Sequence, residues 1–256
     1  MDDKEKLEKL AQLIIDSNNI IVLSGAGMST ESGIADFRTP NTGLWETVDP
    51  YEFGDIRSYV NDTGNYFKMM LEVGLAIFRA KPNKGHKALT RLQKLGKLHG
   101  ILTQNIDNLH KKARTKCEIV ELHGTVTESK CMKCKKIFPI TTLVNKVLSG
   151  KSVTCDECNG LLKPNAIFFG EPLEFNTLAR ADKLIDDCDL LIVLGSSLLV
   201  SPVSFYPARA ISHGAKVAII NIQDTYIDAQ AEVVIHDKIG DIFPLIVDLV
   251  EQKLSH

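Results

Sequence analysis

The sequence lacks the features of a membrane or secreted protein. No apolar run approaches the roughly 18 residues that span a bilayer, and the polar N-terminus has none of the apolar core of a signal peptide. An excess of one charge is also missing, because the net charge is -2 at pH 7. We therefore expect a cytoplasmic protein that does not bind a membrane, and we expect no direct nucleic-acid binding.

Internal repeats and low-complexity segments are absent as well. The 256 residues can bury a large core, either in one large domain or in a large and a small one. Hydrophobic residues make up 44% of the chain and charged residues 24%, as is ordinary for a soluble globular protein. In a reducing compartment, the six cysteines favour metal ligands or free thiols over disulfides.

Residues 20–38 (IIVLSGAGMSTESGIADFR) combine an apolar strand with a turn of small residues. Residues 20–23 form an unbroken apolar run, which is typical of a strand buried on both faces. Small residues follow at 24–27, and residues 29–32 are of the types that cap and open a helix. Such a turn can bind an anion at the helix N-terminus, which suggests a nucleotide phosphate. Because Thr30 replaces the third glycine of the dinucleotide fingerprint and the ribose-binding acid is missing, an ordinary tight turn is the alternative.

Further apolar segments predict the other strands of a sheet. They lie at residues 98–103, 119–124, 189–194, 216–221 and 232–236. Helical patterns lie at residues 3–17, 86–95 and 241–254, and a mixed, mostly helical pattern at 45–78 indicates an inserted helical module. Strands that alternate with helices and end in small or polar residues predict an α/β fold, with a doubly wound parallel sheet and a site along its carboxyl edge.

Candidate site residues lie just past two of these strands. The sequence Gln-Asn-Ile-Asp at 104–107 follows the second strand, where open α/β sheets bind ligands. Asn105 and Asp107 are equally suited to capping the helix that follows. His123 ends the next strand, and its side chain titrates near neutrality, although a lone histidine is more often structural. For His110, on the following helix, we favour a structural role.

Four cysteines form the strongest signal in the chain. The pair Cys131 and Cys134 is separated by twenty residues from the pair Cys155 and Cys158. Two Cys-x-x-Cys turns at this spacing predict a zinc ribbon with four thiolate ligands, and hence a structural zinc with no open coordination position. Redox pairs are the alternative, but neither pair opens a helix in a thioredoxin-like context. Four lysines within residues 129–136 leave a zinc module that binds nucleic acid or protein as a competing function.

Several motifs together resemble one family. The segments GAGMSTESGIADFR, TQNIDNLH, ELHG, the paired Cys-x-x-Cys, FFGE, GSSLLVSP and NIQDT occur in the order typical of sirtuins, the NAD-dependent protein deacylases, of the bacterial and archaeal type. The resemblance spans about residues 10–250. It implies a Rossmann-like domain and a smaller lobe, which is made of a helical insertion and a zinc ribbon. The Rossmann-like domain would comprise residues 1–38, 80–127 and 161–256, the insertion 39–79 and the ribbon 128–160.

The resemblance also implies a role for each matching residue. Contacts with NAD are expected at Ala26, Thr30, Phe37, Arg38, Gln104, Asn105, Ile106, Asp107, His123, Ser196, Ser197, Asn221 and Ile239. His123 would be the general base, with Asn105 and Asp107 as further catalytic residues. The acylated peptide would bind as an extended strand between two segments. These segments contain Ile167, Phe168, Phe169, Gly170, Glu171, Leu199 and Val200.

The implied reaction consumes NAD as a cosubstrate and yields deacylated lysine, nicotinamide and O-acyl-ADP-ribose. Protein mono-ADP-ribosyl transfer is the alternative, since it needs the same NAD site. The family branch that prefers succinyl or malonyl groups carries a Tyr-x-x-Arg pair in the helical module. Here Tyr59 is followed three positions on by Asp62, and Tyr66 by Met69. We therefore expect acetyl or longer apolar chains to be preferred.

Overall fold

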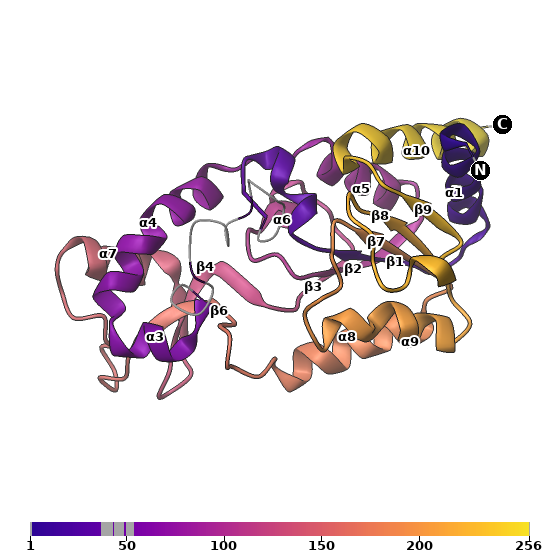
Figure 1. Cartoon of the computed structure of the whole chain (residues 1–256). Coiled ribbons are helices and arrows are strands. Elements are labelled where there is room, and N and C mark those ends of the chain that lie inside the picture. Colours follow the sequence, from indigo (N-terminus) through magenta and orange to yellow (C-terminus); the bar gives the residue numbers. More distant parts are fainter. Residues whose placement is uncertain (1, 37–42, 44–48, 50–53, 256) are drawn as a thin grey trace.

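The computed structural model describes residues 2–36, 43, 49 and 54–255, and it has a large domain and a smaller lobe (Figure 1). The large domain contains a six-stranded parallel sheet in the order β3-β2-β1-β7-β8-β9. Its strands are β1 (Ile20–Ser24), β2 (Leu98–Thr103), β3 (Glu118–Glu121), β7 (Leu190–Leu194), β8 (Lys216–Ile220) and β9 (Val233–Ile235). The order reverses between β1 and β7, which opens a crevice at the carboxyl ends of the strands. The predicted α/β fold is confirmed.

Helices cover both faces of this sheet, one set above it and one below it in Figure 1. One face carries α1 (Asp3–Asp16), α5 (Lys84–Lys94) and α10 (Ile239–Leu254), and the other carries α8 (Phe175–Asp187) and α9 (Tyr206–Ser212). In β1, Ile20 and Val22 belong to the first of the two cores, and Ile21 and Leu23 to the second. Both faces of the strand are thus buried, which explains the unbroken apolar run.

Helix boundaries follow local signals in the sequence. Before α1, Asp2 accepts a hydrogen bond from the Glu5 amide at 2.7 Å, and Glu5 accepts one from the Asp2 amide at 3.0 Å, which closes a capping box. Before α5, the Asn83 side chain accepts a hydrogen bond from the His86 amide at 3.2 Å. Within the described ranges, none of the helices has the length and apolar character needed to cross a membrane.

The smaller lobe contains helices and a second sheet. Its helices are α3 (Ile56–Asn61), α4 (Thr63–Arg79) and α7 (Ile140–Leu148), and its antiparallel strands, in the order β5-β4-β6, are β4 (Gly124–Cys131), β5 (Ile137–Pro139) and β6 (Leu162–Ala166). The sequence indicated the helices of the insertion but not this sheet or α7. The domain boundaries stay a prediction, and the strands of this sheet extend beyond the range 128–160 at both ends.

The turn after β1 differs from its prediction. Residues 29–32 do not open an α-helix, because two short 3-10 helices, Ala26–Met28 and Thr30–Ser32, stand there instead. The hydroxyls that were expected to cap a helix bond elsewhere: Ser29 donates to Asp107 at 2.6 Å, and Thr30 donates to the Gly27 carbonyl at 3.1 Å. Gly33, with φ of 83°, then ends the second 3-10 helix.

Candidate active site and metal centre

An open cleft lies along the carboxyl edge of the parallel sheet. It encloses about 930 Å³ of space, part of which is open to solvent. Predicted site residues that line it are Ala26, Thr30, Gln104, Asn105, His123, Ser196, Ser197, Leu199, Val200, Asn221 and Ile239. These residues come from turns after five different strands and from the start of α10, so the fold brings together segments that are far apart in the sequence.

The glycines after β1 permit one turn to pack directly on another. The Gly27 amide donates to the Gly195 carbonyl at 2.9 Å, in the turn that follows β7. A Cβ atom on Gly25 would lie 2.6 Å from the Gly195 carbonyl oxygen, and one on Gly27 would lie 2.9 Å from the Gly195 Cα atom. The small residues that suggested close approach to a ligand are therefore also required by the contact between these two turns.

Asn105 and Asp107 are held from behind the cleft by Ser29. The Asn105 side-chain amide donates to the Gly25 carbonyl at 2.9 Å and to the Ser29 hydroxyl at 3.2 Å. The same hydroxyl donates to one Asp107 oxygen at 2.6 Å, and the other oxygen accepts from the Leu109 amide at 2.8 Å. Asp107 thus also accepts from the first amide of the short helix α6 (Leu109–Lys112), whose N-cap residue is Asn108. Burial raises the pKa of Asp107, and the Ser29 hydrogen bond opposes that shift.

His123 lies at the junction of β3 and β4 and lines the cleft. Its Nδ1 atom is 3.0 Å from the Gln104 carbonyl oxygen, which can only accept, so Nδ1 carries the proton and Nε2 is the basic nitrogen of the neutral ring. Burial lowers the pKa of His123, and this hydrogen bond opposes the shift in part. A neutral histidine of this tautomer can accept a proton in the cleft.

His110 has the structural surroundings that were favoured for it. It is buried, and its Nε2 atom lies 2.9 Å from the Ser24 hydroxyl. Burial lowers the pKa of His110 to about 4, so the ring is neutral at physiological pH. It does not line the cleft.

Two polar or charged residues make contacts in the site that had no signal in the sequence. Ser29 joins the turn after β1 to the loop after β2, and Glu31 accepts a hydrogen bond from the Gly240 amide at 2.7 Å, at the start of α10. Glu31 lines the cleft together with the predicted Ile239. Ser29 and Asp107 are 78 positions apart, so only the fold reveals their contact.

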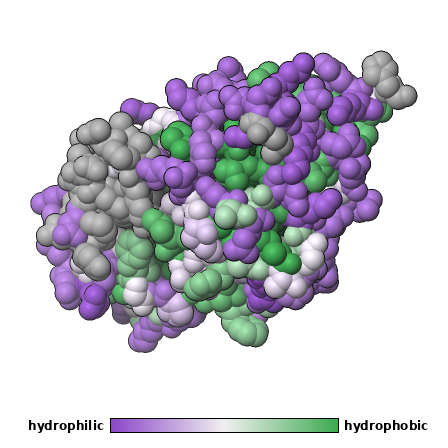
Figure 2. Space-filling model, turned by 45° about the vertical axis from the view of Figure 1, so that its right-hand side comes forward, coloured by the Kyte–Doolittle hydropathy of each residue, from purple (hydrophilic) through white to green (hydrophobic). Residues whose placement is uncertain are grey.

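Several other predicted contact residues that the structure describes do not line the cleft. Ile106 is half-buried and its carbonyl accepts from the Val126 amide at 3.1 Å. Phe37 and Arg38 fall outside the described residues. In the predicted peptide segment, the Phe168 side chain is buried among tyrosines of the small lobe, whereas Phe169 is 41% exposed. Figure 2 shows hydrophobic residues gathered near the middle and lower part of the face in view, with hydrophilic residues over most of the rest.

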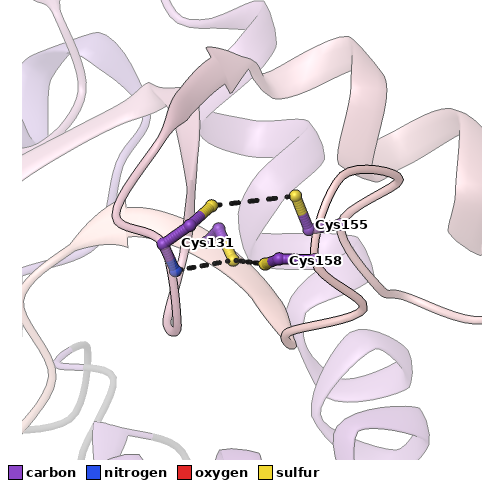
Figure 3. A group of neighbouring side chains, drawn as sticks. Cys131, Cys155 and Cys158 are labelled. Carbon is purple, nitrogen blue, oxygen red and sulfur yellow. Dashed lines mark hydrogen bonds between the residues drawn. The ribbon is translucent and has the colours of Figure 1, made fainter.

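The four ribbon cysteines come together as predicted. Figure 3 labels three of them, Cys131, Cys155 and Cys158. The Sγ atoms of Cys131 and Cys158 are 3.4 Å apart, and those of Cys134 and Cys155 are 3.9 Å apart. A tetrahedral zinc with Zn–S bonds near 2.3 Å separates its thiolates by roughly 3.8 Å, so the cluster fits this ion.

The backbone around the cysteines repeats in the two turns. The amide of Lys135 donates to the Cys131 carbonyl, and that of Asn159 to the Cys155 carbonyl. Both Lys135 and Asn159 have positive φ, at 63° and 54°. Two matched turns that aim their sulfur atoms at one point are what a structural site requires.

The lysines of the ribbon have partners. Lys130 forms an ion pair with Glu174 and Lys136 one with Glu157, while Lys133 donates to the Cys158 carbonyl at 3.4 Å. Three of the four lysines in residues 129–136 are therefore engaged within the protein.

Comparison with known proteins then decides the family. A family model described as the Sir2 family matches residues 25–202, which is more than half of the chain. The chain belongs to the Sir2 family. One Sir2 relative, NAD-dependent protein deacetylase 2 of Caldanaerobacter subterraneus subsp. tengcongensis, is 40% identical over 239 residues, which cover 93% of each chain. The resemblance to sirtuins is confirmed.

Solved Sir2 structures have the same fold. A complex of Sir2 with a p53 peptide and NAD+ is 32% identical, with a TM-score of 0.86 over 98% of this chain and 99% of that chain. A complex of a Sir2 variant with deacetylated p53 peptide and 3'-O-acetyl ADP-ribose is 33% identical, with a TM-score of 0.88 over 94% and 97% of the two chains.

Proposed function

We propose that this Sir2 protein is an NAD-dependent protein-lysine deacetylase. It removes acetyl or other neutral acyl groups and yields nicotinamide, O-acyl-ADP-ribose and free lysine. The observation that carries the proposal is His123, a neutral base in a cleft at the switch point of a parallel sheet. The deacetylase name of the relative and the acetyl ADP-ribose in a Sir2 complex support it, and neither favours the mono-ADP-ribosyltransferase alternative.

The side chains around the cleft divide the work. NAD, as the consumed cosubstrate, supplies the ribose carbon to which the acyl oxygen is transferred. Asn105 contacts the nicotinamide end, and Asp107 orients Asn105 through Ser29, since Asp107 itself does not line the cleft. His123 Nε2 takes the proton that a ribose hydroxyl loses on attack.

The adenosine half of NAD lies toward the turns after β7 and β8. Ser196, Ser197 and Asn221 line this part of the cleft, with Ile239 at its edge. The Ser196 hydroxyl donates to the Gln104 side chain at 2.7 Å, which joins this half to the loop after β2. The zinc ion takes no part in the chemistry, because four thiolates complete a tetrahedral shell.

Acetyl and longer apolar chains are preferred over succinyl and malonyl. Tyr59 is fully buried and donates its hydroxyl hydrogen to the Leu162 carbonyl, and Tyr66 is buried beside it with ring centroids 4.8 Å apart. Both tyrosines thus belong to the core of the small lobe. A Tyr-x-x-Arg pair that could hold a carboxylate is not formed by either of them.

The test uses matched peptides that carry acetyl-, succinyl- or myristoyl-lysine. We expect the purified protein to release one nicotinamide and one O-acyl-ADP-ribose for each lysine freed, with acetyl turned over faster than succinyl. Mass spectrometry decides between the two reactions, because deacylation lowers the mass of the peptide whereas ADP-ribosyl transfer raises it. Faster turnover of succinyl-lysine would refute the argument from Tyr59 and Tyr66.

A further inference from the structure

Lys163 is a buried lysine that no part of the proposed mechanism uses. It lies in β6, opposite Lys130 of β4, and is only 5% exposed. Its Nζ atom lies 2.6 Å from the Ala166 carbonyl oxygen, 3.2 Å from the Pro164 carbonyl oxygen and 2.9 Å from Glu171 Oε2. The ammonium group has three donors, and each of them meets one acceptor.

A buried ammonium group is expensive unless its charge is balanced. Burial lowers the pKa of Lys163, and the ion pair with Glu171 opposes the shift. The Phe168 ring adds a cation–π contact, with Nζ 4.9 Å from the ring centroid. The segment from 166 to 171, together with the Pro164 carbonyl, thus supplies the groups that balance the buried ammonium group of Lys163.

Glu171 uses its carboxylate to close a turn of this segment. Its Oε2 atom, which pairs with Lys163, also accepts from the Phe168 amide at 2.9 Å, and its own amide donates to the Phe168 carbonyl at 3.0 Å. Gly170, between them, has φ of 87°, in the left-handed region. The carboxylate is thus directed inward, toward Lys163 and the backbone, and away from a peptide partner.

The enclosed segment connects the catalytic side of the cleft with the helical insertion. The Ile167 amide donates to the His123 carbonyl at 2.8 Å. Two residues on, the Phe169 amide donates to the Gly54 carbonyl at 2.7 Å, and its carbonyl accepts from the Ile56 amide at 3.1 Å. A strand that adds a peptide by backbone pairing needs its own backbone fixed in place.

We propose that Lys163 is a positioning residue for the acylated peptide: with Glu171 it fixes residues 167–170 in the conformation that receives the peptide, and it does not contact the peptide itself. This inference rests on the proposed deacetylase function. It also reassigns Glu171 from a peptide contact to an internal anchor.

Steady-state kinetics with an acetyl-lysine peptide and NAD+ test the proposal, with Lys163→Met, Lys163→Arg and Glu171→Gln as variants. We expect Lys163→Met and Glu171→Gln to raise the KM for peptide about tenfold, equivalent to about 1.4 kcal/mol, and to leave the KM for NAD+ within twofold. Lys163→Arg keeps the charge and should restore much of the peptide affinity. Lys130→Met, which removes the neighbouring lysine of the same sheet, is the matched control and should leave both KM values unchanged.

Several outcomes would overturn the inference. A role in stability alone would lower Tm and change the two KM values equally, or change neither. If Lys163→Met does not fold, Glu171→Gln decides, because it keeps the shape of the side chain and removes only the charge. Coupling between the two residues is checked with the double variant Lys163→Met/Glu171→Gln. Its loss of peptide affinity should be smaller than the sum of the losses of the two single variants. A wild-type protein without turnover would instead refute the deacetylase function, so the two failures are distinguishable.

Discussion

Substitution of Ser29 by alanine should destabilise the protein and loosen its active site together. Ser29 is only 1% exposed. Its hydroxyl donates to buried Asp107 at 2.6 Å and accepts from Asn105 at 3.2 Å. A hydrogen bond to a charged group contributes about 1.5–3 kcal/mol, and its loss leaves a carboxylate oxygen without this donor. We expect the free energy of unfolding to fall by that amount, and Tm to fall by about 2–4 °C for each kcal/mol.

The same substitution has a pH signature. Burial already raises the pKa of Asp107 above its ordinary value of 3.8, and the Ser29 hydrogen bond is the largest influence that lowers it. Because the pKa is raised in the folded state, the folded protein binds more protons than the unfolded chain between pH 3.8 and the folded-state pKa. The free energy of unfolding therefore falls as pH rises through this range. Ser29→Ala should raise the pKa of Asp107 in the folded state further. The free energy of unfolding should then fall by more, and over a wider range of pH.

Urea unfolding of both proteins from pH 4 to pH 8 measures the effect, with deacetylation kinetics in parallel. Ser32→Ala is the matched control: it lies three residues on in the same turn, and its buried hydroxyl finds no hydrogen-bond partner among the described residues. The control should be neutral or slightly stabilising. Equal stability of Ser29→Ala and wild type, or a loss that does not depend on pH, would refute the role assigned to the hydroxyl.

Three further predictions concern the base, the metal and the turn after β7. His123→Ala should abolish deacetylation. In the wild-type protein, the acid limb of the kcat profile should lie below pH 6.5, because burial lowers the pKa of His123 from that value. An acid limb above pH 6.5 would contradict the role of His123 as a neutral base. Zinc removal by a chelator should unfold the small lobe, followed by circular dichroism, and turnover should fall only as the fold is lost; prompt inhibition with the fold intact would oppose a structural role. Gly195→Ala should destabilise the large domain by several kcal/mol in urea unfolding. The new Cβ atom would lie 2.6 Å from the Gly27 carbonyl carbon, and the residue would keep a φ of 64°. Wild-type stability of this variant would show that the turns after β1 and β7 can move apart without cost.

The parallel sheet could be predicted from the sequence because its strands are buried on both faces. Residues 190–194 alternate between the two cores, and all five are buried, so the strand is one apolar run. The small-lobe sheet left no such run. In β4 (GTVTESKC), polar residues are interspersed with buried positions. The strand is stabilised by pairing with β5 and with β6, and β6 lies more than thirty positions further along the chain. Long-range pairing of this kind cannot be inferred from local pattern.

The site divides in the same way. Residues on turns after predicted strands, such as Asn105 and His123, could be found because a parallel sheet collects such turns at one edge. The roles of Ser29, Glu31 and Lys163 could not be found, because each acts through a partner that only the fold supplies. The zinc site needed no such information, since the spacing of its four cysteines already specifies two turns around one ion.

The incomplete glycine fingerprint of the first turn has a physical explanation in the packing of the two turns. Gly25 and Gly27 face Gly195, and a side chain on any of the three would collide with backbone atoms of the other turn. Thr30 is exposed, lines the cleft and donates its hydroxyl hydrogen to the Gly27 carbonyl, so its side chain has room that the three glycines lack. Glycine is therefore required where the turns after β1 and β7 meet, at the switch point of the sheet. It is not required at position 30, which lines the cleft and does not face the turn after β7.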